Sequence, residues 1–269
     1  MSWKEFFELL SYPFVMRGLA VGLLVSLCAS ALGVVLVLKR YSLIGHGLSE
    51  VGFAALSIAL ALGLPPLYVS TPLVIAASFV IMFVSQRKRF GGDVAIGIAS
   101  SGALAAGIIV TTLTRGLNVD VYNYMFGSIL AMTREDVVLS VVLAVFVIGL
   151  FVLFYNRLFL IVYNEDYART LGIDVTRYQF LISFLTALTV VLGMRMMGTL
   201  LISSLIIMPA VTARKLAKSF KGLVAASVAV SVFCFLAGMV ASFVLNLPTG
   251  ASVVAANLVV LSASRLCRC

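Results

Sequence analysis

Nine apolar runs follow one another along this chain of 269 residues, and most are long enough to cross a lipid bilayer as helices. A transmembrane helix needs about 20 mostly apolar residues, because its backbone polar groups must be satisfied inside the hydrocarbon. The pattern therefore predicts an all-α polytopic transmembrane bundle with nine spans, or eight if 178–213 is one bent hairpin that does not cross fully. The nine runs cover residues 18–38, 48–66, 71–86, 94–113, 137–155, 178–194, 198–213, 222–245 and 250–264.

The composition excludes a soluble or disordered chain. Hydrophobic residues make up 62% of the sequence and charged residues 11%, about half the charged fraction of a soluble domain. A disordered chain does not contain so much apolar surface. The formal net charge of +9 would suggest nucleic-acid binding in a soluble protein, but in a membrane protein it reflects loops rich in Lys and Arg. We therefore expect membrane lipid around the chain and no nucleic-acid partner.

The positions of the positive charges predict which side of the membrane each loop occupies. With nine spans, fourteen of the nineteen Lys and Arg residues fall in loops on one side and five on the other. Cytoplasmic loops carry the excess of Lys and Arg in membrane proteins. The side with fourteen is therefore predicted to be cytoplasmic, which places the N-terminus outside and the C-terminus in the cytoplasm.

Two segments outside the apolar runs have patterns of their own. Residues 1–12 place aromatic and aliphatic side chains at helical spacing beside charged ones, which predicts an interfacial amphipathic helix. The longest inner connection, 156–177, contains the segment Asn164–Gly172, with an acidic start, a helix-forming centre and a glycine stop. These features predict a short capped helix. It is amphipathic and cytoplasmic, so it either lies on the membrane or docks into a partner protein.

A histidine and a glutamate lie one helical turn apart at the start of the second apolar run. His46 is the sole histidine, and Glu50 is the only carboxylate inside an apolar run, where a charge costs about 2.5–3.5 kcal/mol. On a helix both side chains share one face. An imidazole and a carboxylate suit Zn²⁺, Mn²⁺ or Fe²⁺; the alternative is an internal hydrogen-bonded pair or proton relay. Gly45, Gly47 and Ser49 flank the pair and allow a neighbouring helix to approach closely.

Other chemistry-bearing residues have a simpler interpretation. Arg195 lies between two apolar runs, where we expect it to extend its charged end to the membrane interface. Thioethers can bind Cu(I), but methionines are common packing residues in apolar helices, so we favour packing for those near Arg195. These methionines are Met194, Met196 and Met197.

Four segments, in order along the chain, resemble the membrane permease subunit of the divalent-metal (zinc, manganese and iron) ABC-transporter family. They are Gly33–Gly45, Asp93–Gly97, Gly198–Arg214 and Asn246–Gly250. The resemblance implies that residues 1–269 form a single transmembrane permease domain in the plasma membrane of a prokaryote. It also implies ATP-driven import of a divalent metal ion, zinc or manganese first and iron as a further candidate.

The same resemblance implies partners. It predicts a homodimer of permeases bound to two cytoplasmic ABC ATPase subunits and supplied by an extracytoplasmic metal-binding solute protein. The chain contains no P-loop phosphate-binding motif, so we expect it not to be an enzyme, with ATP hydrolysed in the separate subunit. No permanently bound cofactor is expected, since the metal ion is cargo. The segment 164–172 matches the family's coupling helix, which implies ATPase contacts from Glu165, Asp166, Tyr167, Ala168, Arg169, Leu171 and Gly172.

The sequence departs from the family pattern at the predicted metal contacts. The family commonly has aspartate at the position of His46 and histidine at that of Glu50, so the order is reversed here. One imidazole and one carboxylate per subunit remain, which favours metal contact and leaves the identity of the metal open. Asn246 replaces a frequently acidic residue, which weakens a role as an outer ligand. The rival functions are a permease for a metal chelate such as a siderophore or cobalamin, and an ion-gradient-driven cation carrier with Glu50 as its proton site.

Overall fold

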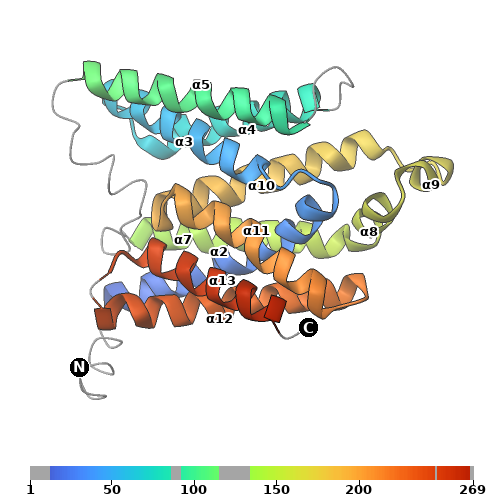
Figure 1. Ribbon diagram of the computed structural model, residues 1–269. Coiled ribbons are helices and arrows are strands. Elements are labelled where there is room, and N and C mark those ends of the chain that lie inside the picture. The colour runs from blue at the N-terminus through green and yellow to red at the C-terminus, as the bar shows by residue number, and fades with distance from the viewer. Residues whose placement is uncertain (1–12, 86–91, 115–133, 246, 267–269) are drawn as a thin grey trace.

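The computed structural model describes residues 13–85, 92–114, 134–245 and 247–266, and within these ranges it contains eleven α-helices and no strand (Figure 1). The predicted all-α bundle is therefore confirmed. Nine of the helices follow the nine apolar runs: α2 (Pro13–Leu38), α3 (Ile44–Ala61), α4 (Pro66–Ser85), α5 (Gly92–Leu113), α7 (Arg134–Leu153), α10 (Val175–Met197), α11 (Thr199–Leu216), α12 (Phe220–Leu245) and α13 (Thr249–Leu266). Two more, α8 (Tyr155–Tyr163) and α9 (Glu165–Thr170), lie in the predicted inner connection. The predicted interfacial helix at 1–12 lies outside the described residues.

The expected eight or nine spans are a slight overcount. Among the described residues, six helices are long and apolar enough to cross a membrane, namely α2, α3, α5, α10, α11 and α12. A seventh is added if α7 and α8, which meet at a bend of 64°, form one broken span. The apolar helical parts of α4 and α13, Tyr68–Val84 and Thr249–Ser264, are shorter; 17 helical residues rise only about 25 Å. Since α10 and α11 each reach the required length, the structure favours two spans over one bent hairpin at 178–213.

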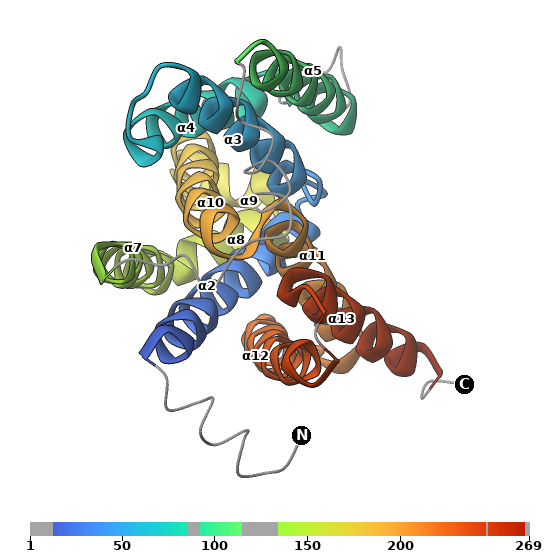
Figure 2. The same ribbon diagram turned by 90° about the vertical axis from the view of Figure 1, so that its left-hand side faces the viewer.

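Three helices form the centre of the bundle. α2, α10 and α11 pack against one another, α3, α4 and α5 form a group on one flank, and α12 and α13 lie on the other (Figure 2). In α2 and α10, 72% of the residues in the most apolar stretch are buried, against 22% in α5. The outer face of α5 is therefore directed towards lipid or another protein.

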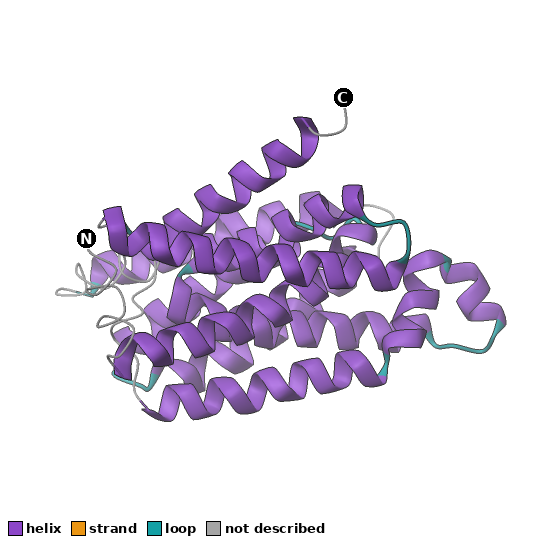
Figure 3. Ribbon diagram, turned by 90° about the horizontal axis from the view of Figure 1, so that it is seen from below, coloured by secondary structure: helices purple, strands orange, loops and turns teal. Residues whose placement is uncertain are grey.

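Three connections predicted to be cytoplasmic, namely those after α2, around α8 and α9, and before α12, lie together at one end. Lys39, after α2, forms an ion pair with Glu165 at the start of α9, and Phe159 of α8 packs on Phe220 at the start of α12. Figure 3 shows the helices running side by side, with the short helices projecting beyond that end. The grouping agrees with the distribution of positive charge; which side faces the cytoplasm stays a prediction.

Candidate functional site

The residues predicted to contact metal share one helix, α3. This helix begins at Ile44, so His46 lies in its first turn and Glu50 in its second, about 6 Å further along the axis. The side chain of His46 is exposed, whereas Glu50 is buried, with 9% of its surface accessible. Figure 1 shows α3 starting short of the end of the bundle at which α5 begins. The pair therefore lies within the length of the bundle.

Small residues let three helices pack closely around the start of α3. A methyl group added at any of three glycines would come within 3 Å of a neighbouring side chain: Ile206 of α11 for Gly45, Ile96 of α5 for Gly47 and Met194 of α10 for Gly52. The close approach expected at Gly45 and Gly47 is thus present. The hydroxyl of Ser49 donates to the carbonyl oxygen of Gly45 at 2.7 Å and is satisfied within its own helix.

These contacts leave His46 uncovered near the start of α3, whereas Glu50 is buried. Successive residues of a helix are 100° apart, so Gly45 and Gly47 lie on opposite sides of His46. One side is covered by α11 and the other by α5, and Figure 2 shows α3 between these two helices. His46 consequently projects between them, which explains why it is exposed inside a largely buried helix.

The described residues of one chain supply only part of a metal coordination shell. Across the described ranges, no three or more His, Cys, Asp or Glu residues are grouped so that they could hold a metal ion. A closed Zn²⁺ site needs four ligands, and His46 and Glu50 provide two. A Zn²⁺ ion bound by His46 and Glu50 would therefore need further ligands from beyond the described residues of this chain. Metal contact by His46 and Glu50 stays a prediction.

Met194 and Met197, the two described methionines beside Arg195, pack in the core. Met194 and Met197 are 1% and 2% exposed, and the sulfur of Met194 lies against Gly52. Because Gly52 is 200° around α3 from Glu50, Met194 packs on a different face from the predicted metal ligands. The packing role expected for these two methionines is supported. The side chains of Arg195 and Met196, and all of Asn246, lie outside the described residues.

The short helix predicted in the inner connection is present and is capped at both ends. The side chain of Asn164 accepts a hydrogen bond from the amide of Tyr167 at 3.0 Å. At the other end, Gly172 has a φ of 75° and the amide of Ile173 donates to the carbonyl of Ala168 at 3.1 Å, as in a Schellman motif. Ile173 also packs on the small cluster containing Ala168. Local contacts therefore hold α9 in shape where it projects from the bundle (Figure 1).

The backbone at Gly172 provides a test of this cap. No atom lies within 4 Å of a Cβ added there, so Gly172→Ala changes only the cost of the left-handed conformation, about 1–2 kcal/mol. We expect amide exchange in α9 to rise about five- to thirtyfold by hydrogen–deuterium exchange. Gly149→Ala, in the middle of α7 and equally free of neighbours, is the matched control and should leave α9 unchanged. Equal protection of α9 in both variants would contradict the strain argument.

The predicted ATPase contacts divide into exposed and internal side chains. Asp166, Tyr167, Arg169 and Leu171 are exposed, as is Gly172. Two further predicted contacts have partners within the chain. Ala168 is fully buried and packs with Ile161 and Val175, while Glu165 is half-buried and pairs with Lys39.

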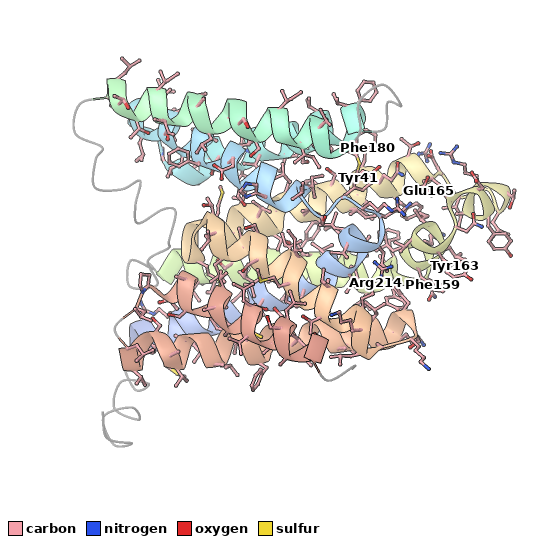
Figure 4. The ribbon with its side chains drawn as sticks, viewed as in Figure 1. Tyr41, Phe159, Tyr163, Glu165, Phe180 and Arg214 are labelled. Atoms are coloured by element: carbon pink, nitrogen blue, oxygen red, sulfur yellow. The ribbon has the colours of Figure 1, made fainter. Side chains whose placement is uncertain are left out.

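The structure adds a polar cluster that the sequence analysis missed. One carboxylate oxygen of Glu165, Oε1, accepts from Nζ of Lys39 and, at 2.9 Å, from Nε2 of Gln179. Burial of Tyr41, together with the nearby charge of Glu165, raises the pKa of the Tyr41 hydroxyl above its usual value (Figure 4). These four residues are called the Glu165 cluster below. No local pattern indicates them, because Lys39 and Glu165 are 126 positions apart.

Comparison with known proteins supports one family for nearly the whole chain. A family model described as the ABC 3 transport family matches residues 11–268. The chain is 28% identical to the high-affinity zinc uptake system membrane protein ZnuB of Haemophilus influenzae over 243 residues, which cover 90% of this chain and 93% of that protein. It is 29% identical to the manganese transport system membrane protein MntC of Halalkalibacterium halodurans over 256 residues, covering 94% and 88%.

A solved structure supports the same relationship. The chain superposes on PsaBC from Streptococcus pneumoniae, determined in complex with a Fab, with a TM-score of 0.87 and 26% identity. The match covers 98% of this chain and 95% of the other. The fold is therefore shared across almost the full length of both chains.

Proposed function

The chain belongs to the ABC 3 transport family, and from this membership we propose that it is the membrane permease subunit of an ATP-driven importer of divalent transition metal ions. The observation that carries the proposal is the nearly full-length match to permeases named for zinc and for manganese. Zinc or manganese is accordingly the expected cargo, with iron as a further candidate. The ion is a substrate that passes through, so its site must bind weakly enough to release it.

The metal path in this proposal is lined by His46 and Glu50. Their side chains lie one turn apart on one side of α3, where His46 is exposed and Glu50 is buried. If two copies of the chain face each other across this side, the path contains two imidazoles and two carboxylates. Such a set is sufficient for the four-coordinate geometry that Zn²⁺ favours.

The remaining parts of the transporter are other proteins. We place ABC ATPase subunits at the end of the bundle where α9 projects, with the exposed side chains Asp166, Tyr167, Arg169 and Leu171 directed towards them. We place an extracytoplasmic metal-binding protein at the opposite end. The chain is a multi-pass membrane protein, and in this proposal it forms a single permease domain over 1–269, pairs as a homodimer in the prokaryotic plasma membrane and has a cytoplasmic C-terminus.

Reconstitution tests the function directly. The chain is placed in lipid vesicles with a candidate ATPase subunit and binding protein, and uptake of Zn²⁺, Mn²⁺ and Fe²⁺ is followed with a metal-sensitive dye. We expect uptake only when the ATPase and ATP are both present, because the chain has no nucleotide-binding loop. ATP-independent uptake by the chain alone would contradict the proposal and support an ion-gradient-driven carrier. Uptake of a siderophore or cobalamin in place of free ions would support a chelate permease.

A further inference from the structure

Three separate segments of the chain meet at the side chain of Glu165. Glu165 is the first residue of α9, Lys39 follows the last residue of α2, and Gln179 lies in the second turn of α10. Both partners contact the same carboxylate oxygen. The side chain of Lys39 is only 10% exposed and Gln179 is buried. This is therefore a partly buried ion pair, unlike exposed pairs that contribute about 0–1 kcal/mol.

The connection that contains Lys39 is held rigidly up to the start of α3. After α2, Arg40 has a φ of 60°, which is uncommon for a residue other than glycine. The amide of Tyr41 donates to the carbonyl of Leu36 at 2.9 Å, and the amide of Ile44 donates to the carbonyl of Tyr41 at 3.1 Å. These hydrogen bonds restrict the backbone conformation of the connection between Lys39 and the first turn of α3.

The same short path joins the two functional regions. From Lys39, five residues lead to Ile44, where α3 begins, and His46 follows in the first turn. At the other end of the ion pair, Glu165 is the first residue of α9, the helix whose exposed side chains are the predicted ATPase contacts. The Glu165 cluster thus directly joins the start of α9 to the connection that leads to α3.

We propose that Glu165 and Lys39 are positioning residues that couple α9 to the helix carrying His46 and Glu50. The inference rests on the proposed function, in which α9 docks on the ATPase. Closure of the nucleotide sites moves α9, the ion pair moves the α2–α3 connection with it, and the start of α3 shifts relative to α5 and α11. Gln179 transmits the same displacement to α10. Without the ion pair, ATP hydrolysis continues but no longer drives metal movement.

A charge exchange tests the coupling. In the reconstituted transporter, uptake and ATP hydrolysis are measured in the same vesicles for Lys39→Glu, Glu165→Lys and the double variant that carries both changes. We expect the uptake per ATP hydrolysed to fall about tenfold or more in each single variant. The double variant restores the opposite charges, and the Gln179 amide can accept from a lysine through its oxygen, so the ratio should recover to within a few-fold.

An exposed lysine from the same end of the bundle gives the matched control. Lys218 lies in the α11–α12 connection without an ion-pair partner among the described residues, and Lys218→Glu should leave the ratio unchanged. If Lys39→Glu does not assemble, Lys39→Met removes the charge while keeping side-chain length and gives the same comparison. Melting temperatures and complex assembly are recorded for all variants, since a merely structural role would lower those and not the ratio.

The outcomes separate this inference from the proposed function. If the wild-type complex takes up metal and Lys39→Glu keeps the wild-type ratio, the coupling role is overturned and the proposed function stands. The same conclusion follows if both single variants fail and the assembled double variant shows no recovery. If the wild-type complex hydrolyses ATP without taking up any of the three metals, the proposed function fails, and the coupling inference fails with it.

Discussion

Replacement of either His46 or Glu50 by alanine is expected to abolish metal uptake by the reconstituted transporter. Each chain offers one imidazole and one carboxylate on one face of α3, so removing either halves the proposed protein ligands on the path. Folding should be little affected, because His46 is exposed and Glu50→Ala removes a carboxylate that is costly to bury. Uptake is measured with the metal-sensitive dye, together with assembly and basal ATP hydrolysis, which we expect to persist.

The control for the His46→Ala and Glu50→Ala variants is a substitution on the same helix. Ser49 is fully buried beside Glu50, and its hydroxyl donates to the carbonyl of Gly45 in the same helix, so Ser49→Ala should retain uptake. Calorimetric measurement of metal binding by the detergent-solubilised complex distinguishes whether His46 and Glu50 are metal ligands or a proton relay. Loss of binding in His46→Ala and Glu50→Ala supports direct contact. Normal uptake in both variants would contradict any role for the pair in the path.

Local signals in the sequence predicted those features that depend on local chemistry. The apolar runs indicated nine helices, and the acidic start and glycine stop of 164–172 indicated α9, since hydrophobic burial and capping act over a few residues. The spacing of His46 and Glu50 placed both on one face in the same way. What spacing does not show is which neighbours cover a face, so the exposure of His46 and the burial of Glu50 required the packed structure.

Features that depend on distant segments were not predicted. Lys39 and Glu165 are far apart in the sequence, and each alone is an ordinary loop charge; only packing of α2 beside α9 makes them a partly buried pair. The span count was also too high, because the described apolar helical parts of α4 and α13 are too short to be counted as spans. In α7 and α8 the chain bends by 64° at their junction, and no proline or glycine lies there to indicate it.

Gly33→Ala is expected to disrupt the centre of the bundle. A Cβ at this position would lie 1.9 Å from the carbonyl oxygen of Ile206 and 2.9 Å from its carbonyl carbon. Backbone atoms cannot rotate away as a flexible side chain can, so α2 and α11 must separate. Overpacking a core costs about 1–3 kcal/mol, and we expect at least the upper end here. Thermal unfolding of the detergent-solubilised protein measures the change, with Gly149→Ala in α7, which has no neighbour within 4 Å, as the matched control.

The same substitution should also affect transport in any protein that still assembles. Ile206 contributes its backbone to the contact with Gly33 and its side chain to the contact with Gly45, where a Cβ would lie 2.7 Å from Cδ1 of Ile206. A displacement of α11 at Ile206 therefore moves the surface on which α3 rests immediately before His46. We expect Gly33→Ala to lower uptake as well as stability. Unchanged unfolding temperature and uptake relative to Gly149→Ala would show that α2 and α11 can separate without cost, contrary to the close backbone contact.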